Sequence, residues 1–189
     1  MEKSLLVVLL VGVALISYGS VSTMFGSQTV GDCTCDSVRD MVAWAEGKLP
    51  CVYKDQLGVP TVGIGFNLER WHARETFEQF GLNYDNVLNG SVCLTDDQIY
   101  ALLDNDLSWA TDGAKNCVSS YPSQNGCVQN VLIDMSFNNG GASLCNWPDF
   151  VGMLNNRDMA GASNYMQNTE WCGIVGRRCT RNASLVRDC

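Results

Sequence analysis

The 189-residue sequence contains a single histidine, His72, and no Cys-x-x-Cys pair. Catalytic zinc sites and the Ser–His or Cys–His pairs of many hydrolases depend on histidine, so this scarcity disfavours those classes. The closest cysteine pair, Cys33-Thr34-Cys35, has one intervening residue and does not match a structural zinc motif. We therefore expect no metal and no cofactor, and we expect His72 to lie on the surface.

Positive charge is also scarce. The sequence has 12 Lys and Arg against 20 Asp and Glu, a formal net charge of −8. Nucleic acids and anionic membranes attract basic faces, so we expect neither as a partner. An acidic chain is better suited to an acidic compartment, such as a digestive lumen or a phagosome, where carboxylates are partly neutralised and repel one another less.

Long apolar runs are limited to one, from Leu5 to Ile16. Its length is typical of a signal-peptide core and is below the roughly 20 residues that a membrane-spanning helix needs. The small residues Ser17, Gly19, Ser20 and Ser22 follow, so we expect a signal peptide over 1–22 that is cleaved near 19–22. The alternative is an uncleaved anchor. The rest, 23–189, is expected to be one secreted domain, monomeric and free of the membrane.

Cysteine is abundant by contrast. Ten cysteines in a secreted chain predict up to five disulfide bonds, whose pairing the sequence leaves open. Each bond stabilises the fold by on the order of 2–4 kcal/mol, chiefly by restricting the unfolded chain. Two Asn-x-Ser acceptors for glycosylation, at Asn89 and Asn182, fit the same secretory route, although the sequence does not decide whether either is used.

Hydrophobic periodicity predicts an α+β chain that is mostly helical, with a small sheet at its N-terminal side. A first helix is capped at Ser37 and ends at Glu46, and a long helix begins at Thr95, where Gln98 completes a capping box. The other expected elements are a hairpin over 51–65, a short helix near 70–80, and helices over 128–137, 148–155, 159–167 and 175–180.

Two carboxylates and a hydroxyl, on Glu46, Asp55 and Thr61, lie where a helix end leads into a hairpin. Glycoside hydrolysis needs one carboxylic acid to protonate the leaving oxygen and a second carboxylate on the other face of the sugar. The negative end of the helix and partial burial favour a protonated Glu46, whereas the polar turn after Asp55 favours an ionised carboxylate. Such different environments assign acid and base roles. The alternative for any single carboxylate is a solvated surface charge.

The same segment resembles the phage-type lysozymes, glycoside hydrolase family twenty-four. Their signature is Glu, eight residues, Asp, five residues, Thr, and then Gly-x-Gly-His, and Glu46, Asp55, Thr61 and Gly63-Ile64-Gly65-Phe66 match it except at the last residue. The resemblance implies that Glu46 is the general acid, that Asp55 positions or deprotonates the attacking water, and that Thr61 holds this water. It also implies a two-lobed fold with a small N-terminal sheet and a long inter-lobe helix.

A second stretch extends the resemblance. In the family, a Trp is followed seven residues later by an Arg that pairs with the catalytic Glu, and Trp171 and Arg178 have this spacing. Asn138 falls where the family usually has a Gln that contacts the Trp. Arg177 is an alternative to Arg178, and either arginine could instead be a solvated charge.

Phe66 is the departure from the signature. The family's His at this position pairs with an Asp on the long helix, which here aligns with Asp106. Because Phe66 cannot form that ion pair, we expect aromatic packing in its place, a change in stability rather than in chemistry.

The resemblance implies a secreted muramidase, used in antibacterial defence or in digestion of bacteria. Its substrate would be peptidoglycan, cleaved by an inverting path at the β-1,4 bond between N-acetylmuramic acid and N-acetylglucosamine. A chitinase-like glycosidase would instead prefer chitin oligomers. A catalytically silent peptidoglycan-binding protein would bind walls without releasing fragments. A purely structural disulfide-rich protein is disfavoured by the intact spacing of the three candidate residues.

Overall fold

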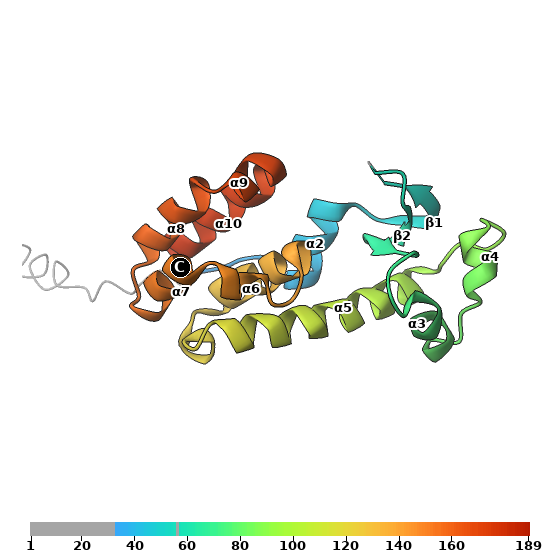
Figure 1. Cartoon of the computed structure of the whole chain (residues 1–189), viewed down its shortest axis with the longest axis horizontal. Coiled ribbons are helices and arrows are strands. Elements are labelled where there is room, and N and C mark those ends of the chain that lie inside the picture. The colour runs from blue at the N-terminus through green and yellow to red at the C-terminus, as the bar shows by residue number, and fades with distance from the viewer. Residues whose placement is uncertain (1–32, 56) are drawn as a thin grey trace, which may run out of the picture. The chain divides into compact units, whose positions relative to one another are not determined.

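The computed structural model describes residues 33–55 and 57–189, shown in Figure 1. The predicted signal peptide lies outside the described residues. A compact unit comprises Thr34–Cys189. Within the described part of the chain, no helix has both the length and the apolar character needed to cross a membrane.

The described chain is an α+β protein dominated by helix, as the sequence predicts, with nine α-helices and one small antiparallel sheet. In chain order the elements are α2 (Val38–Glu46), β1 (Leu49–Lys54), β2 (Pro60–Gly63), β3 (Phe66–Asn67), α3 (Ala73–Gln79), α4 (Tyr84–Leu88), α5 (Asp96–Cys117), the 3-10 turn η1 (Tyr121–Ser123), α6 (Gly126–Asn139), the 3-10 turn η2 (Ser143–Asn146), α7 (Pro148–Asn155), α8 (Met159–Gln167), α9 (Glu170–Val175) and α10 (Arg177–Asp188).

Both predicted helix starts are confirmed by their caps. The Ser37 hydroxyl accepts a hydrogen bond from the backbone N–H of Asp40, at 3.2 Å, and α2 follows. Thr95 and Gln98 form a complete capping box at the start of α5. These reciprocal bonds satisfy backbone donors that the first helical turn leaves unpaired.

The sheet has the order β1-β2-β3, with both pairs antiparallel. Tyr53 pairs with Thr61 across β1 and β2, and Val62 pairs with Phe66 across β2 and β3. Val62 and Phe66 are buried, as is Ile64 between them. One face of the sheet therefore packs into the core, which fixes the position of the hairpin that carries the candidate residues.

The long helix α5 links this sheet region to the helices that follow. It packs along α6, as Figure 1 shows. A Cβ atom on Gly113 would lie 1.8 Å from the carbonyl oxygen of Gly141, so glycine is required for the chain after α6 to reach α5.

The C-terminal helix differs from the prediction of 175–180. Gly176, with φ of +52°, ends α9, and α10 extends over Arg177–Asp188. The buried face of α10 includes the polar residues Arg178 and Asn182, so an apolar periodicity search does not detect it. The short helix α4 was also not predicted.

The described cysteines are all in disulfide bonds. The bonds include Cys35–Cys127, Cys51–Cys93, Cys117–Cys145 and Cys172–Cys179, and Cys33 and Cys189 are disulfide-bonded as well. The two glycosylation acceptors differ in access. Asn89 is exposed, whereas the amide of the fully buried Asn182 is hydrogen-bonded inside the fold and is not available to a glycan.

Candidate active site

Glu46 is the last residue of α2 and its carboxylate is held on two sides. Its Oε1 atom accepts a hydrogen bond of 2.6 Å from Nη1 of Arg178. Its Oε2 atom lies against Gly65, where an added Cβ would come within 3.3 Å of it. Gly65 has φ of +71°, which disfavours any other residue. The side chain keeps 25% of its surface exposed, so Glu46 is fixed in place yet reachable from solvent.

Asp55 follows β1 and is oriented by its own turn. Its Oδ1 atom accepts hydrogen bonds from the backbone N–H groups of Leu57 and Val59, both at 2.8 Å. The backbone N–H of Asp55 in turn donates to the carbonyl of Val59 at 3.0 Å. Within the described residues, the Oδ2 atom makes no hydrogen bond, which leaves it available to a water or a substrate.

Thr61 is buried at the start of β2, and its hydroxyl donates to the carbonyl of Val59 at 3.1 Å. Because the hydroxyl proton is used in this bond, the Oγ1 lone pairs can accept a hydrogen bond from a bound water. The backbone of Val59 thus orients both Asp55, through its N–H, and Thr61, through its carbonyl.

Tyr53 on β1 is a neighbour of Thr61 in the sheet. Partial burial raises the pKa of its phenol, and the negative charges of Glu46 and Asp55 raise it further. The same hairpin carries Tyr53, Asp55 and Thr61, and Gly65 at its end lies against the carboxylate of Glu46.

A buried charge cluster supports Glu46 from the opposite side. The guanidinium of Arg178 forms two hydrogen bonds with the Asp134 carboxylate, at 2.9 and 3.0 Å, besides its bond to Glu46. Arg181 and Asn182 also donate to Asp134, at 3.3 and 2.6 Å. Asp134 has 0% of its surface exposed, and its charge is balanced by the two arginines. Arg178, not Arg177, is the arginine that reaches Glu46.

The charges in this cluster shift the pKa of its arginines in opposite directions. Burial alone would lower the pKa of Arg178, but hydrogen bonds and attraction from Asp134 and Glu46 outweigh it, and the pKa is raised. For Arg181, burial lowers the pKa, the attraction of Asp134 only partly offsets this, and the like charge of Arg178 lowers it further. Arg178 is therefore the cation on which both carboxylates converge.

Asp134, Arg181 and Asn182 were missed by sequence reasoning. Each is a polar residue at a position with helical spacing toward the core, Asp134 on α6 and the other two on α10. The sequence did contain a signal for this cluster. An isolated Asp lies in the apolar stretch of α6, and two arginines lie three residues apart on α10. Because a buried charge requires a partner, the Asp could have been matched to these arginines.

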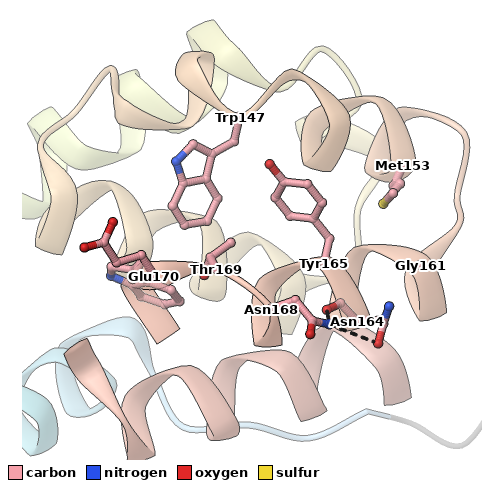
Figure 2. A pocket seen from close by; sticks show the side chains of 9 residues that line it. Trp147, Met153, Gly161, Asn164, Tyr165, Asn168, Thr169 and Glu170 are labelled. Atoms are coloured by element: carbon pink, nitrogen blue, oxygen red, sulfur yellow. Dashed lines mark hydrogen bonds between the residues drawn. The ribbon is translucent and has the colours of Figure 1, made fainter. Parts of the chain in front are cut away.

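Trp171 and Asn138 also meet. The indole N–H of Trp171 donates to the Asn138 side-chain oxygen at 2.8 Å. Trp171 lines a pocket of about 640 Å³, which Figure 2 shows with the rings of Trp147 and Tyr165 beside it. None of the three candidate catalytic residues lines this pocket.

Phe66 packs as expected, but the ionic contact with Asp106 is not lost. The Phe66 ring meets Phe77 edge to face, with centroids 5.2 Å apart. Arg70 also stacks on the Phe66 ring, its guanidinium carbon 3.7 Å from the ring centroid, and forms two hydrogen bonds with Asp106, at 2.7 and 2.8 Å. The expectation of aromatic packing alone was therefore incomplete, because Arg70, four residues further on, supplies the cation.

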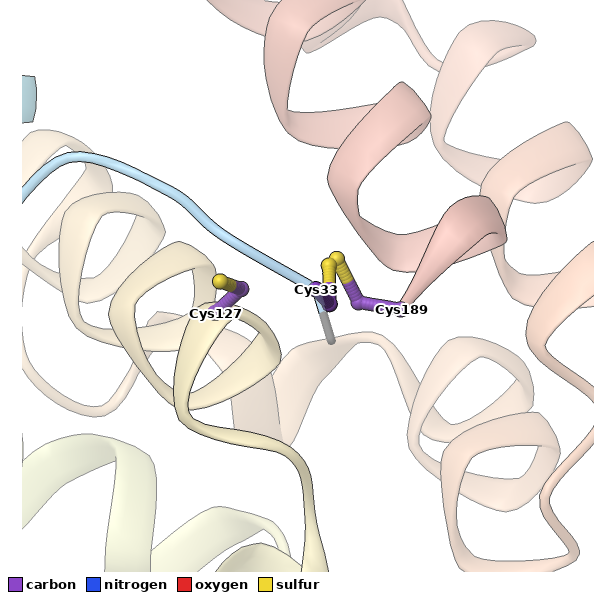
Figure 3. Close-up of side chains that lie close together, drawn as sticks. All are labelled: Cys33, Cys127 and Cys189. Carbon is purple, nitrogen blue, oxygen red and sulfur yellow. The ribbon is translucent and has the colours of Figure 1, made fainter. Parts of the chain in front are cut away.

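A group of cysteines resembles a metal-ligand cluster but lacks the necessary thiolates. The Sγ atoms of Cys127 and Cys189 lie within 4.8 Å of each other, and Figure 3 draws them with Cys33. All three residues are in disulfide bonds. Cysteine binds metal as the thiolate, so these sulfur atoms cross-link the fold and do not form a metal site.

Comparisons with known proteins cover the same region. The phage lysozyme family matches residues 43–186, a range that includes Glu46, Asp55, Thr61 and Arg178. The chain belongs to the phage lysozyme family. A protein of Dictyostelium discoideum named "Probable T4-type lysozyme 1" is 24% identical over 158 residues, which cover 79% of this chain and 93% of the relative. Membership of the phage lysozyme family suggests glycoside hydrolase activity and implies a peptidoglycan substrate.

Proposed function

We propose that this protein is a secreted muramidase that hydrolyses the β-1,4 bond between N-acetylmuramic acid and N-acetylglucosamine in peptidoglycan. The observation that supports the proposal is the placement of the three residues in a chain of the phage lysozyme family: Glu46 is held by Arg178 against Gly65, and Asp55 and Thr61 are both bonded to the backbone of Val59. Two carboxyl groups of different surroundings, one on a helix end and one in a turn, are the chemical requirement for this reaction.

Glu46 acts as the general acid in this scheme. Arg178 holds Oε1, so Oε2, beside Gly65, is the oxygen that can present a proton to the glycosidic oxygen. Proton transfer converts the leaving glycosidic oxygen into a neutral hydroxyl as its bond to the anomeric carbon breaks. Arg178 is then close to the negative charge that remains on Glu46.

Asp55 and Thr61 act on the water that attacks the other face of the sugar. The water donates one proton toward the free Oδ2 of Asp55 and the other toward the Thr61 oxygen, whose own proton is bonded to Val59. As the new carbon–oxygen bond forms, the water proton passes to Asp55. This direct displacement inverts the anomeric configuration.

We also propose secretion, in support of antibacterial defence or the digestion of bacteria. Disulfide bonds persist in oxidising compartments and are rare in the cytosol, and every described cysteine is in one. The net charge of −8 favours an acidic extracellular, digestive or phagosomal compartment.

The identity of the sugar at the new reducing end tests the function. Purified oxidised protein is incubated with peptidoglycan, the fragments are reduced with borohydride, and the reduced sugars are identified by mass. Wild type and Glu78→Gln, which changes an exposed glutamate on α3, are expected to produce reduced muramic acid, and Glu46→Gln is expected to produce none.

Other products would contradict the proposed function and indicate a different one. Reduced N-acetylglucosamine, or preferential cleavage of chitin oligomers, would make the protein a glycosidase of different specificity. Binding to walls without released fragments would make it a silent binding protein. Normal release by Glu46→Gln would remove Glu46 from the mechanism.

A further inference from the structure

A second pocket, of about 440 Å³, lies beside the candidate active site. Its lining comes from three parts of the chain: the segment from β3 to α3, the middle of α5, and the end of α6 with the residues that follow. The residues used below are Gly65, Arg70, Trp71, His72, Asp106 and Trp109.

Two tryptophans in this lining are unusually exposed. Trp71 has 85% of its surface accessible and Trp109 has 73%. Tryptophan is highly buried on average, and exposed aromatic side chains at a pocket indicate a binding role more often than isolated ones do. Trp71 lies before α3 and Trp109 lies on α5, so the pocket has an aromatic side chain from each of two separate elements.

The segment that presents Trp71 is fixed on both sides. Arg70 is anchored by its paired hydrogen bonds to Asp106 and by stacking on Phe66. His72 has φ of +63°, a left-handed conformation that is uncommon for residues other than glycine. Strain of this kind persists only where the surrounding contacts impose it, and here it occurs at the residue that follows Trp71.

The pocket and the candidate catalytic carboxylate share one neighbour. Gly65 lines the pocket, and the Oε2 atom of Glu46 lies against Gly65. A polymer bound at Glu46 that continued past Gly65 would enter the pocket that Trp71 and Trp109 line.

The chemistry of the pocket fits a sugar. Indole rings offer flat apolar surfaces to the C–H faces of sugar rings, and a few fixed polar groups orient the ligand. Arg70 and Asp106 both line the pocket and are held by each other, so they supply donors and acceptors at defined positions.

We propose that Trp71 and Trp109 form the walls of a subsite for the sugar rings adjacent to the bond cleaved at Glu46. The ligand is a strand of β-1,4-linked N-acetylated hexosamines. This inference rests on the proposed function, because it takes the same glycan as the ligand and adds two residues that determine how much of the strand is bound.

Dependence on glycan length tests this subsite. The variants are Trp71→Ala and Trp109→Ala, with Phe80→Ala as the matched control, since Phe80 is an exposed aromatic residue at the end of α3 outside this pocket. Cleavage is measured on glycan fragments of increasing length. The loss of one stacking contact raises KM for long fragments roughly 3- to 10-fold, with kcat nearly unchanged. The shortest fragment that is cleaved shows no change, and Phe80→Ala behaves as wild type.

A binding measurement separates this inference from the proposed function. The inactive Glu46→Gln protein, with and without each tryptophan substitution, is titrated with N-acetylglucosamine oligomers of two to six sugars, using the change in tryptophan fluorescence. Affinity for the longer oligomers is expected to fall roughly 3- to 10-fold in the tryptophan variants.

The outcomes distinguish the two claims. If wild type cleaves peptidoglycan but the tryptophan variants match it at every length, the subsite is wrong and the function stands. If wild type cleaves nothing but binds oligomers in a manner that depends on Trp71 and Trp109, the proposed function is wrong and the two tryptophans still form a sugar-binding site. Equal losses on short and long fragments, or an equal loss in Phe80→Ala, would also overturn the subsite.

Discussion

The two candidate carboxylates are held in opposite ways. Asp55 is oriented by backbone N–H groups no more than four residues away, in its own turn. Glu46 is held by Arg178, which is 132 residues distant in sequence, and Arg178 is in turn held by the buried Asp134. The position of Asp55 is a local property of the hairpin, whereas the position of Glu46 depends on the packing of α2, α6 and α10.

This difference separates two kinds of sensitivity. Changes deep in the helical region are expected to disturb Glu46 and the stability of the fold together, because a buried ion cluster serves both. Changes in the turn that carries Asp55 are expected to alter chemistry with little loss of stability, because its hydrogen bonds are short-range and partly exposed.

Removal of Asp134 should have the largest effect on stability. Asp134→Ala leaves Arg178 buried without its main partner, and we expect the free energy of unfolding to fall by about 3–5 kcal/mol. Urea unfolding measures this. Asp112→Ala, which changes an exposed residue of α5, is the control and should stay within about 0.5 kcal/mol of wild type. A loss of less than about 1 kcal/mol in Asp134→Ala would contradict the role of the cluster.

The loss of stability on removal of a disulfide bond should increase with the length of the loop that the bond closes. The Cys51–Cys93 bond closes a separation of 42 residues on the hairpin side, and Cys172–Cys179 closes 7 residues beside Arg178. From loop-closure entropy, the first double Ala variant should lose about 4 kcal/mol and the second about 2 kcal/mol. Thermal or urea unfolding gives the order. The reverse order would show that contacts around α9 and α10 matter more than chain restriction.

Substitution of Gly65 should affect activity more than stability. Gly65→Ala forces a left-handed backbone on alanine, at a cost of about 1–2 kcal/mol, and places a methyl group against Glu46. Gly81→Ala is the matched control, since Gly81 has a similar φ of +66° but no neighbouring atom within 4 Å of an added Cβ. Stability should fall alike in both, and only Gly65→Ala should lose roughly tenfold or more in the rate of wall lysis.

Deprotonation of Tyr53 at alkaline pH should cause a small loss of stability. Burial and the two carboxylates raise its pKa, so the folded state keeps the phenol proton to higher pH than the unfolded chain does. This contribution is complete below about pH 10 and is lost as the pH rises above it. Tyr53→Phe should therefore lose less stability than wild type between about pH 9 and pH 11.

Tyr121 provides the comparison for this pH effect. Its pKa is raised by burial alone, without a carboxylate as a cause. Added salt should reduce the effect of Tyr53→Phe on the alkaline slope, because salt screens the charges of Glu46 and Asp55, and should leave that of Tyr121→Phe unchanged. If salt changed the effects of Tyr53→Phe and Tyr121→Phe equally, the two carboxylates would be too far from Tyr53 to raise its pKa.

The sequence was sufficient where the determinants are local. The caps at Ser37 and Thr95, the boundaries of α7 and α8, and the α+β class follow from short-range signals. The spacing of the candidate residues Glu46, Asp55 and Thr61 is likewise contained in one continuous segment of the sequence. The catalytic roles assigned to Glu46, Asp55 and Thr61 stay predictions until activity is measured.

The parts that sequence reasoning missed depend on residues far apart in the chain. Asp134 and Arg181 join Arg178 only after α6 and α10 pack, and polar residues on a buried face look like surface positions in a periodicity search. Arg70 makes the ion pair with Asp106 that the family's histidine makes, although Arg70 is not at the position in the sequence that aligns with that histidine. Disulfide pairing is similarly a property of the folded chain.

The two-carboxylate mechanism is tested by comparing the rate of peptidoglycan hydrolysis in Glu46→Gln and Asp55→Asn with that of wild type, at equal concentrations of folded protein. We expect each variant to lose at least about 100-fold in rate, because each lacks a general acid or base. We also expect Asp55→Asn to keep the wild-type unfolding midpoint. Near-normal hydrolysis by either variant would contradict the two-carboxylate mechanism.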